Sequence, residues 1–322
     1  MEEVKALNIE NKENKPNKTR KLGAKRRWHW FGIAGLTYLT CYVVVLFFLL
    51  SWAFIKSIHQ FDDYILTGAS VTSFPKVFSF DSYTKVLAVI KFSVRDTTGA
   101  THNVYMLEMV FNAVLYASID SGVRILVIMT TAYVLAKHDF AFNKVIIVCF
   151  YFNMLVPIVG TMSSGLKLHT NLGLMDTWLG AVVLNLHFLG GLTLLIYRDA
   201  FNKLSDGYVE AARLDGAGHY RIMIQIAFPL IKPLWVMGLM TGFIGAWNDY
   251  QTPLVYMPSH PTVSYGMYIF NQAKSGGDNA EFAFVPYKLA GFMLLLLPTT
   301  LFFLCFQKRL LGATTGGGGM KE

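Results

Sequence analysis

One segment of the chain, residues 205–229 (SDGYVEAARLDGAGHYRIMIQIAFP), combines residue types that suit docking against another surface. Ala211 and Ala212 have small side chains, which let a neighbouring backbone approach closely. Glu210 beside them offers one negative charge for an ion pair with a partner. Because the segment lacks clustered acid and base groups, its composition indicates binding rather than catalysis.

The same segment is expected to form a helix, a turn and a second helix. The first helix is predicted over Tyr208 to Asp215, and Gly216 follows where a left-handed residue ends a helix. The second is predicted over His219 to Ala227, where apolar residues recur three or four positions apart. Pro229 then opens the next helix in its first turn, where a missing N–H is tolerated.

Several polar side chains lie inside long apolar stretches, where they are costly unless they are paired or have a function. Asp120 and Arg124 are four residues apart, so they can pair along one helix face; lining a polar path or forming an outer gate is the alternative. Helix packing explains five more residues, with a translocation path as the alternative: Asn153, Asn185, His187, Asn248 and Asp249. No metal site is expected, because no second ligand stands at helical spacing from His187.

The segments that carry these residues are predicted to be membrane helices. Of the 322 residues 54% are hydrophobic and only 15% are charged, whereas soluble domains carry roughly 25% charged residues. A bilayer crossing needs about 20 apolar residues. We therefore predict an all-α membrane protein with six transmembrane helices, at about 31–55, 109–136, 145–166, 177–197, 230–257 and 286–307.

The distribution of positive charge predicts the orientation. The segments assigned to the side of the termini hold 19 Lys and Arg residues, against 7 on the other side. By the positive-inside rule both termini are cytoplasmic and the protein is a multi-pass protein of the cell membrane. The domain plan is a disordered basic N-terminus (1–28), a six-helix transmembrane bundle (29–311) and a Gly-rich tail (312–322). The net charge of +8 is thus explained without a nucleic-acid partner.

The docking segment resembles the EAA loop of ABC importer permeases. Its Glu210, Ala211 and Ala212, then Gly216, then Ile226 and Pro229 fall at the spacing of that motif, and only Phe228 departs, standing where Leu is usual. Weaker strings around it resemble the carbohydrate branch of the family, of the maltose-transporter G-subunit type. They include Trp247, Asn248 and Asp249, and the string of Asn171, Leu172, Gly173, Leu174 and Thr177.

The resemblance implies a type I ABC importer permease fold with a cytoplasmic coupling loop. In that reading Leu214 and Asp215 join the six motif residues in contacting an ATPase, and the chain forms half of the translocation pathway for a sugar or oligosaccharide. Its implied partners are a second permease, two ATP-binding cassette subunits, an extracytoplasmic solute-binding protein and the lipid bilayer. ATP and Mg²⁺ would bind the partner ATPase, because residues 312–322 cannot form a phosphate-binding loop. A non-sugar solute is the alternative.

Two other classes of function are less well supported. A membrane enzyme needs clustered catalytic residues, whereas the eight His residues are dispersed along the chain. A secondary transporter would use Asp120 and Asp249 to carry an ion, but no internal repeat with matching broken helices is apparent. No catalytic residue and no cofactor in this chain are therefore expected.

Overall fold

The computed structural model describes residues 30–66, 74–89, 91–95, 99, 101–156, 160–186, 191–272 and 284–316. The chain divides into two compact units, one ending at Trp52 and one beginning at Ala53. The first unit contains most of helix α2 (Trp30–Ser57), whose sequence holds no charged residue before Lys56. Side chains 32–51 are all exposed, and a helix that is apolar on every side is typical of a membrane span.

The second unit begins with a small mixed region rather than with helices alone. Helices α3 (Phe61–Leu66) and α4 (Asp81–Val89) precede an antiparallel hairpin of β1 (Lys91–Arg95) and β2 (Thr101–Tyr105). The register pairs Lys91 with Tyr105. The described part of the chain is therefore mostly helical, with this short hairpin in addition to the expected helices.

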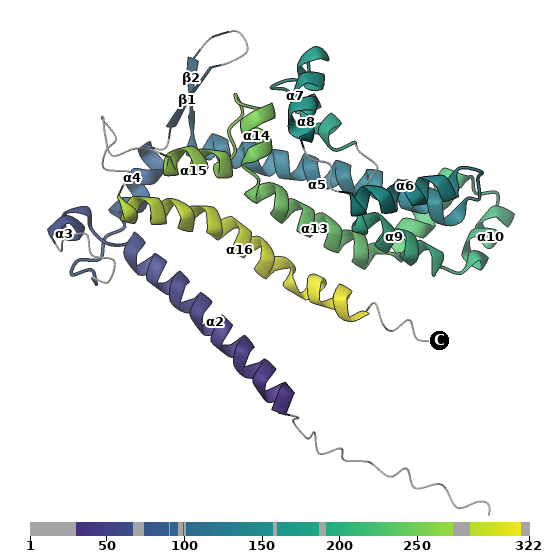
Figure 1. Cartoon of the computed structure of the whole chain (residues 1–322), viewed down its shortest axis with the longest axis horizontal. Coiled ribbons are helices and arrows are strands. Elements are labelled where there is room, and N and C mark those ends of the chain that lie inside the picture. The colour runs from purple at the N-terminus through teal and green to yellow at the C-terminus, as the bar shows by residue number, and fades with distance from the viewer. Residues whose placement is uncertain are drawn as a thin grey trace, which may run out of the picture. The chain divides into compact units, whose positions relative to one another are not determined.

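The centre of the second unit is the long helix α5 (Met106–Lys137), against which α9 (Leu192–Asn202) and α13 (Lys232–Asn248) pack (Figure 1). Glycines let α13 approach closely: a Cβ on Gly242 would lie 3.2 Å from Ser121 Cβ, and one on Gly238 would collide with the Tyr197 hydroxyl. The helix α16 (Val285–Gly316) packs along α13. It continues into the segment expected as a tail.

Two of the predicted crossings are divided in the structure. The expected 145–166 span is covered by α6 (Asn143–Leu155) and α7 (Thr161–Asn171), and Gly160 between them has a left-handed φ of 84°. The expected 177–197 span is covered by α8 (Trp178–Leu184) and part of α9, with Gly191 at φ 56°. The remaining helices are α10 (Asp206–Leu214), α11 (His219–Ile222), η1 (Met223–Ala227), α12 (Phe228–Leu230), α14 (Gln251–Tyr256) and α15 (Val263–Asn271).

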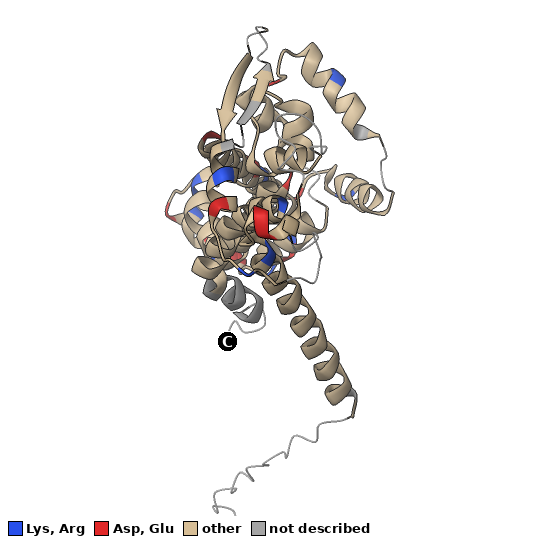
Figure 2. Ribbon diagram, turned by 90° about the vertical axis from the view of Figure 1, so that its left-hand side faces the viewer, with Lys and Arg blue, Asp and Glu red and all other residues tan. Residues whose placement is uncertain are grey.

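Three described helices are long and apolar enough to cross a membrane: Gly32–Ser57, Met106–Lys137 and Val285–Gln307. A fourth span results if His219–Leu230 and Lys232–Asn248, which meet at an 82° bend, form one crossing. In Figure 2 most of the described ribbon is tan, and Lys, Arg, Asp and Glu colour only a small part of it. The structure thus supports a membrane protein with three or four such helices, and the count of six stays a prediction.

The close contact of α13 with α5 and α9 gives the first testable prediction. Gly238→Val should lower the thermal stability of the detergent-solubilised protein, because the new side chain would collide with the Tyr197 hydroxyl and lie against Ile125. Overpacking of this kind costs about 1–3 kcal/mol. Thermal unfolding monitored by fluorescence measures the effect. The matched control is Gly245→Val on the same helix, where no atom lies within 4 Å; an equal loss in both variants would contradict the explanation.

Candidate functional site: the 205–230 segment and the polar cluster of α5

The docking segment folds as the predicted helix-turn-helix. Helix α10 begins after Ser205, whose hydroxyl accepts a hydrogen bond from the Gly207 N–H at 3.3 Å. It ends at Leu214, and Gly216 two residues later has a φ of 79°, which confirms the left-handed residue expected from the sequence. The Gly216 N–H donates to the Arg213 carbonyl at 3.0 Å and the Ala217 N–H to the Ala212 carbonyl at 2.9 Å. These two bonds form a Schellman motif, which satisfies the helix end and fixes the turn.

The second helix is continuous from α11 through η1 to α12, but its hydrogen-bond pattern changes on the way. In η1 the Phe228 N–H donates to the Met223 carbonyl, five residues earlier, which is a π-helical bond. Such bulges occur often at functional sites. Ile231 then leaves the helical conformation, with φ −100° and ψ 19°, and the chain bends by 82° into α13. The bend separates the docking segment from the helix that follows it.

The segment buries one side and exposes the other. Met223 and Ala227 belong to a core cluster with Ile128, Met129 and Ala132 of α5. On the outer side the two helices expose a mixed surface, which includes Glu210, Ala211, Tyr208, Leu214 and Tyr220; Leu214 is 90% exposed. Large apolar side chains left exposed together are typical of an interaction surface.

Among the remaining motif residues, Ala212 is buried, Ile226 is half-buried, and Asp215, Gly216 and Pro229 are exposed. The one departure from the motif, Phe228, has a structural explanation. Its ring lies 6.1 Å from that of Phe201, and its carbonyl accepts the Trp235 indole N–H at 3.2 Å. An aromatic side chain at this position therefore packs into the core formed with α9.

A lysine at the end of α5 holds the start of α10. Lys137 Nζ donates to the Leu204 carbonyl at 2.8 Å and to Asp206 Oδ1 at 2.7 Å, and its side chain is only 8% exposed. The hydrogen bond and charge of Lys137 lower the pKa of Asp206, so the carboxylate stays ionised at neutral pH. The stabilisation from this pair is present above the usual Asp pKa and is lost as the pH falls through the lowered value.

A histidine pair lies beside the contacts of Lys137 with Leu204 and Asp206, which we call the lysine clamp. His138 Nε2 is 3.4 Å from His219 Nδ1. This contact joins His138, directly after α5, to His219, the first residue of α11. Burial, and then the neighbouring His219 and Arg213, lower the pKa of His138. His138 is therefore mostly neutral at pH 7, and the two rings can lie together without charge repulsion.

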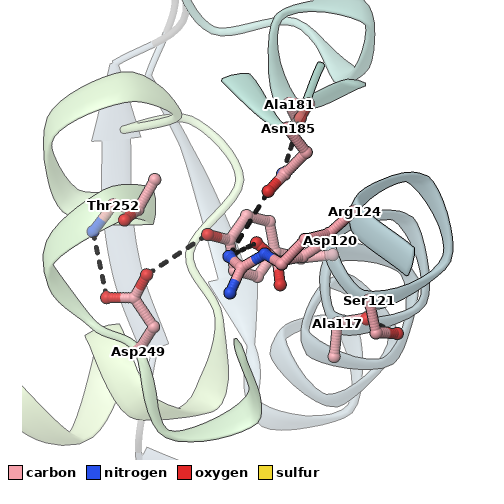
Figure 3. A network of polar contacts seen from close by, with 9 residues as sticks. Ala117, Asp120, Ser121, Arg124, Ala181, Asn185, Asp249 and Thr252 are labelled. Carbon is pink, nitrogen blue, oxygen red and sulfur yellow. Dashed lines mark hydrogen bonds and ion pairs between the residues drawn. The ribbon is translucent and has the colours of Figure 1, made fainter. Parts of the chain in front are cut away.

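A second cluster lies near the middle of α5. Arg124 Nη2 donates to Asp120 Oδ1 at 2.7 Å, which confirms the pair that the spacing of four predicts. The same Arg124 atom lies 3.4 Å from Asn185 Oδ1 at the end of α8, so the pair also reaches a second helix (Figure 3). Tyr116 donates to Asp249 Oδ2 at 3.2 Å, which brings in the end of α13.

The candidate path residues separate into different environments. Asn185 and Asp249 join the cluster, whereas Asn248 is exposed and donates to the Ile244 carbonyl of its own helix at 2.8 Å. Asn153 is half-buried on α6. His187 lies outside the described residues. In the described part of the chain, no group of three or more His, Cys, Asp or Glu side chains could hold a metal ion.

Sequence reasoning missed Tyr116, although its position places it on the same helix face as the charged pair. Tyr116 lies four residues before Asp120. It also missed Asp176, whose Oδ1 accepts the Ser259 N–H at 2.9 Å and whose N–H donates to the Tyr256 carbonyl at 2.8 Å. Asp176 thus connects the α7–α8 turn to the end of α14, and its positive φ of 60° left no clear signal in the sequence.

The model of the family "Binding-protein-dependent transport system inner membrane component" matches residues 125–311, more than half of the chain. The chain belongs to this family. It is an inner-membrane permease component of a binding-protein-dependent ABC transport system, a transport subunit rather than an enzyme. The matched region contains both the helix-turn-helix and most of the helices that pack on α5.

The alignments with curated relatives cover most of the length of the permease. It is 24% identical over 262 residues to the arabinooligosaccharides transport system permease protein AraQ of Bacillus subtilis, covering 81% of this chain and 86% of the relative. It is 26% identical over 212 residues to the maltodextrin transport system permease protein MalD of Streptococcus pneumoniae, with coverages of 64% and 72%. The glucose import system permease protein GlcU of Saccharolobus solfataricus is 25% identical over 194 residues, with coverages of 60% and 66%.

The lysine clamp gives a prediction for the permease. Lys137→Met should increase hydrogen exchange over residues 204–217, because α10 loses two hydrogen bonds that fix its first turn. The matched control is Lys203→Met. Lys203 pairs with Asp199 on the surface, where both side chains are more than 60% exposed, and such pairs contribute little. Equal exchange in the Lys137 variant and the wild type, measured by mass spectrometry, would contradict a holding role.

Proposed function

We propose that the permease forms half of the translocation pathway of an ATP-driven sugar or oligosaccharide importer and that residues 205–230 couple it to the ATPase. The observation that carries this proposal is the family match over residues 125–311, because the matched region holds a helix-turn-helix with a buried stem and an exposed docking face. The three relatives described above are all named for sugar transport, so a sugar is proposed rather than another solute.

The proposed coupling works through rigid contacts. Glu210, Ala211, Leu214, Asp215 and Gly216 offer a docking face because they are exposed at the tip of the segment. The buried side packs on α5 and α9, so a push on the docking face moves packed side chains rather than a loose loop. Glu210 makes no hydrogen bond or ion pair within the described residues, and its carboxylate is suited to a basic residue of the ATPase.

The assembly and orientation follow from the same proposal. A second permease completes the pathway, two ATP-binding cassette subunits hold ATP and Mg²⁺, and an extracytoplasmic binding protein delivers the solute. Both termini and residues 205–230 lie in the cytoplasm, as the distribution of Lys and Arg along the sequence favours. Six crossings, two of them built from shorter helices, would satisfy this orientation.

The test uses the complete importer in proteoliposomes, with uptake of radiolabelled arabinotriose, maltotriose and glucose and ATP hydrolysis measured together. Gly216→Ala should leave membrane insertion intact and lower uptake per ATP hydrolysed, because Ala at φ 79° strains the turn by about 1–2 kcal/mol. Glu210→Gln should do the same by weakening the docking contact.

The matched control for the turn is Gly218→Ala. Gly218 has φ −71°, and a Cβ there would meet no atom within 4 Å. Wild-type coupling in both the Gly216 and the Glu210 variants would remove residues 205–230 from the mechanism. Uptake of none of the sugars by the wild-type importer would instead contradict the assigned solute class.

A further inference from the structure

One face of α5 carries a row of polar residues. Asn112, Tyr116, Asp120 and Arg124 recur every four positions, so they lie along the same side of the helix. The first three are buried, and two of them reach neighbouring segments: Asn112 Nδ2 donates to the Pro261 carbonyl at 3.3 Å, and Tyr116 to Asp249 Oδ2 at 3.2 Å. The row leads from the first turns of α5 to the middle of this 32-residue helix.

Arg124 ends this row and differs from the other three residues. Its side chain is 44% exposed, although it lies near the middle of a helix long and apolar enough to cross a membrane. A cation at that depth is costly against lipid and normally faces the interior of a bundle or a water-filled cavity. The exposed part of Arg124 therefore faces a polar path or another polypeptide.

Arg124 uses only part of its hydrogen-bonding capacity in the contacts described above. Both of its contacts, to Asp120 Oδ1 and Asn185 Oδ1, are made by the single atom Nη2. Over the described ranges of the chain, the N–H groups on its other two nitrogens have no acceptor. Over the same ranges, Asp120 Oδ2 is buried and has no donor. A ligand that offers oxygen acceptors would satisfy the exposed guanidinium.

The charges around Arg124 limit which ligand this can be. Asp120 compensates the guanidinium directly, and Asp249 adds a second carboxylate that accepts three hydrogen bonds, from Gln251 N–H, Thr252 N–H and Tyr116. Two carboxylates against one guanidinium leave no net positive charge to attract an anion. Neutral oxygens, such as hydroxyl groups and ring oxygens, meet the free donors without that repulsion.

We propose that Arg124 contacts the transported solute and that Asp120 and Asn185 are positioning residues for it, forming a subsite for neutral, hydroxyl-rich solutes that disfavours anionic ones. The inference rests on the proposed transport function and adds a residue and a charge preference to it. The partner permease is the other polypeptide that could cover Arg124, and the experiment separates the two.

The experiment uses the complete importer with its binding protein in proteoliposomes. The two probes are a neutral trisaccharide that the wild type imports and the aldonate made by oxidising its reducing end. At saturating binding protein, Arg124→Gln should reduce uptake of the neutral sugar about tenfold, the effect of losing one hydrogen bond to a charged group. The control, Thr130→Ala, removes an exposed hydroxyl of α5 that donates to the Leu126 carbonyl, and should transport normally.

Asp120→Asn tests the charge preference. It removes one of the two carboxylates and makes the cluster one charge less negative, so the ratio of aldonate to neutral uptake should rise about tenfold, the same size as one charge-assisted contact. A purely structural role would lower both rates and leave the ratio unchanged. Because both solutes use the same binding protein, its own selectivity cancels between variant and wild type. The double variant Asp120→Asn with Arg124→Gln should return the ratio to the wild-type value even where total uptake is low.

Three results would overturn the inference. The first is normal uptake of the neutral sugar by Arg124→Gln. The second is an aldonate-to-neutral ratio that equals the wild-type value in Asp120→Asn, or that stays at the Asp120→Asn value in the double variant. The third is loss of co-purification with the second permease in Arg124→Gln. The last would place Arg124 at the subunit interface. A wild-type importer that moves no saccharide would refute the proposed function instead, and that result is seen before any variant is made.

Discussion

The close packing of α5 with α9 and α13 is the contact on which the rest of the second unit depends. Gly238 and Gly242 bring α13 against Tyr197 and Ser121, nearer than larger residues would allow. Between membrane helices, where apolar burial supplies little driving force, such close approach is a main source of association. The same packing determines where the end of α13 lies, and therefore where Asp249 meets Tyr116.

Local features of this chain could be predicted from its sequence because neighbouring residues determine them. Gly216 has the left-handed φ expected after a helix, and Asp120 pairs with Arg124 at a spacing of four. The contacts of Asn185 and Tyr116 join residues on different helices, and only tertiary packing brings those together. The hairpin of β1 and β2 was missed because its strands are short. The division of the expected 145–166 and 177–197 spans was missed because apolar content alone does not reveal a break in a helix.

Residues of the same helix, α5, belong to the polar cluster and hold the docking segment. Arg124 and Lys137 are both residues of α5, thirteen positions apart, or about 20 Å along an α-helix. Between them Ile128, Met129 and Ala132 belong to the core cluster that also contains Met223 and Ala227 of η1. The helix contains no proline, and its residues from Met106 to Lys137 form one uninterrupted α-helix. A contiguous set of packed side chains therefore connects the docking segment to the polar cluster.

This connection restricts how the docking segment can move. Its second helix is held to α5 by apolar packing, and its first helix is held by Lys137, so both halves are fixed to the same element. A displacement of residues 205–230 must either carry the inner half of α5 with it or separate the Met223 and Ala227 contacts and expose apolar surface. Carrying α5 keeps these apolar side chains buried, but α5 is itself packed against α9 and α13, so those helices would have to move with it.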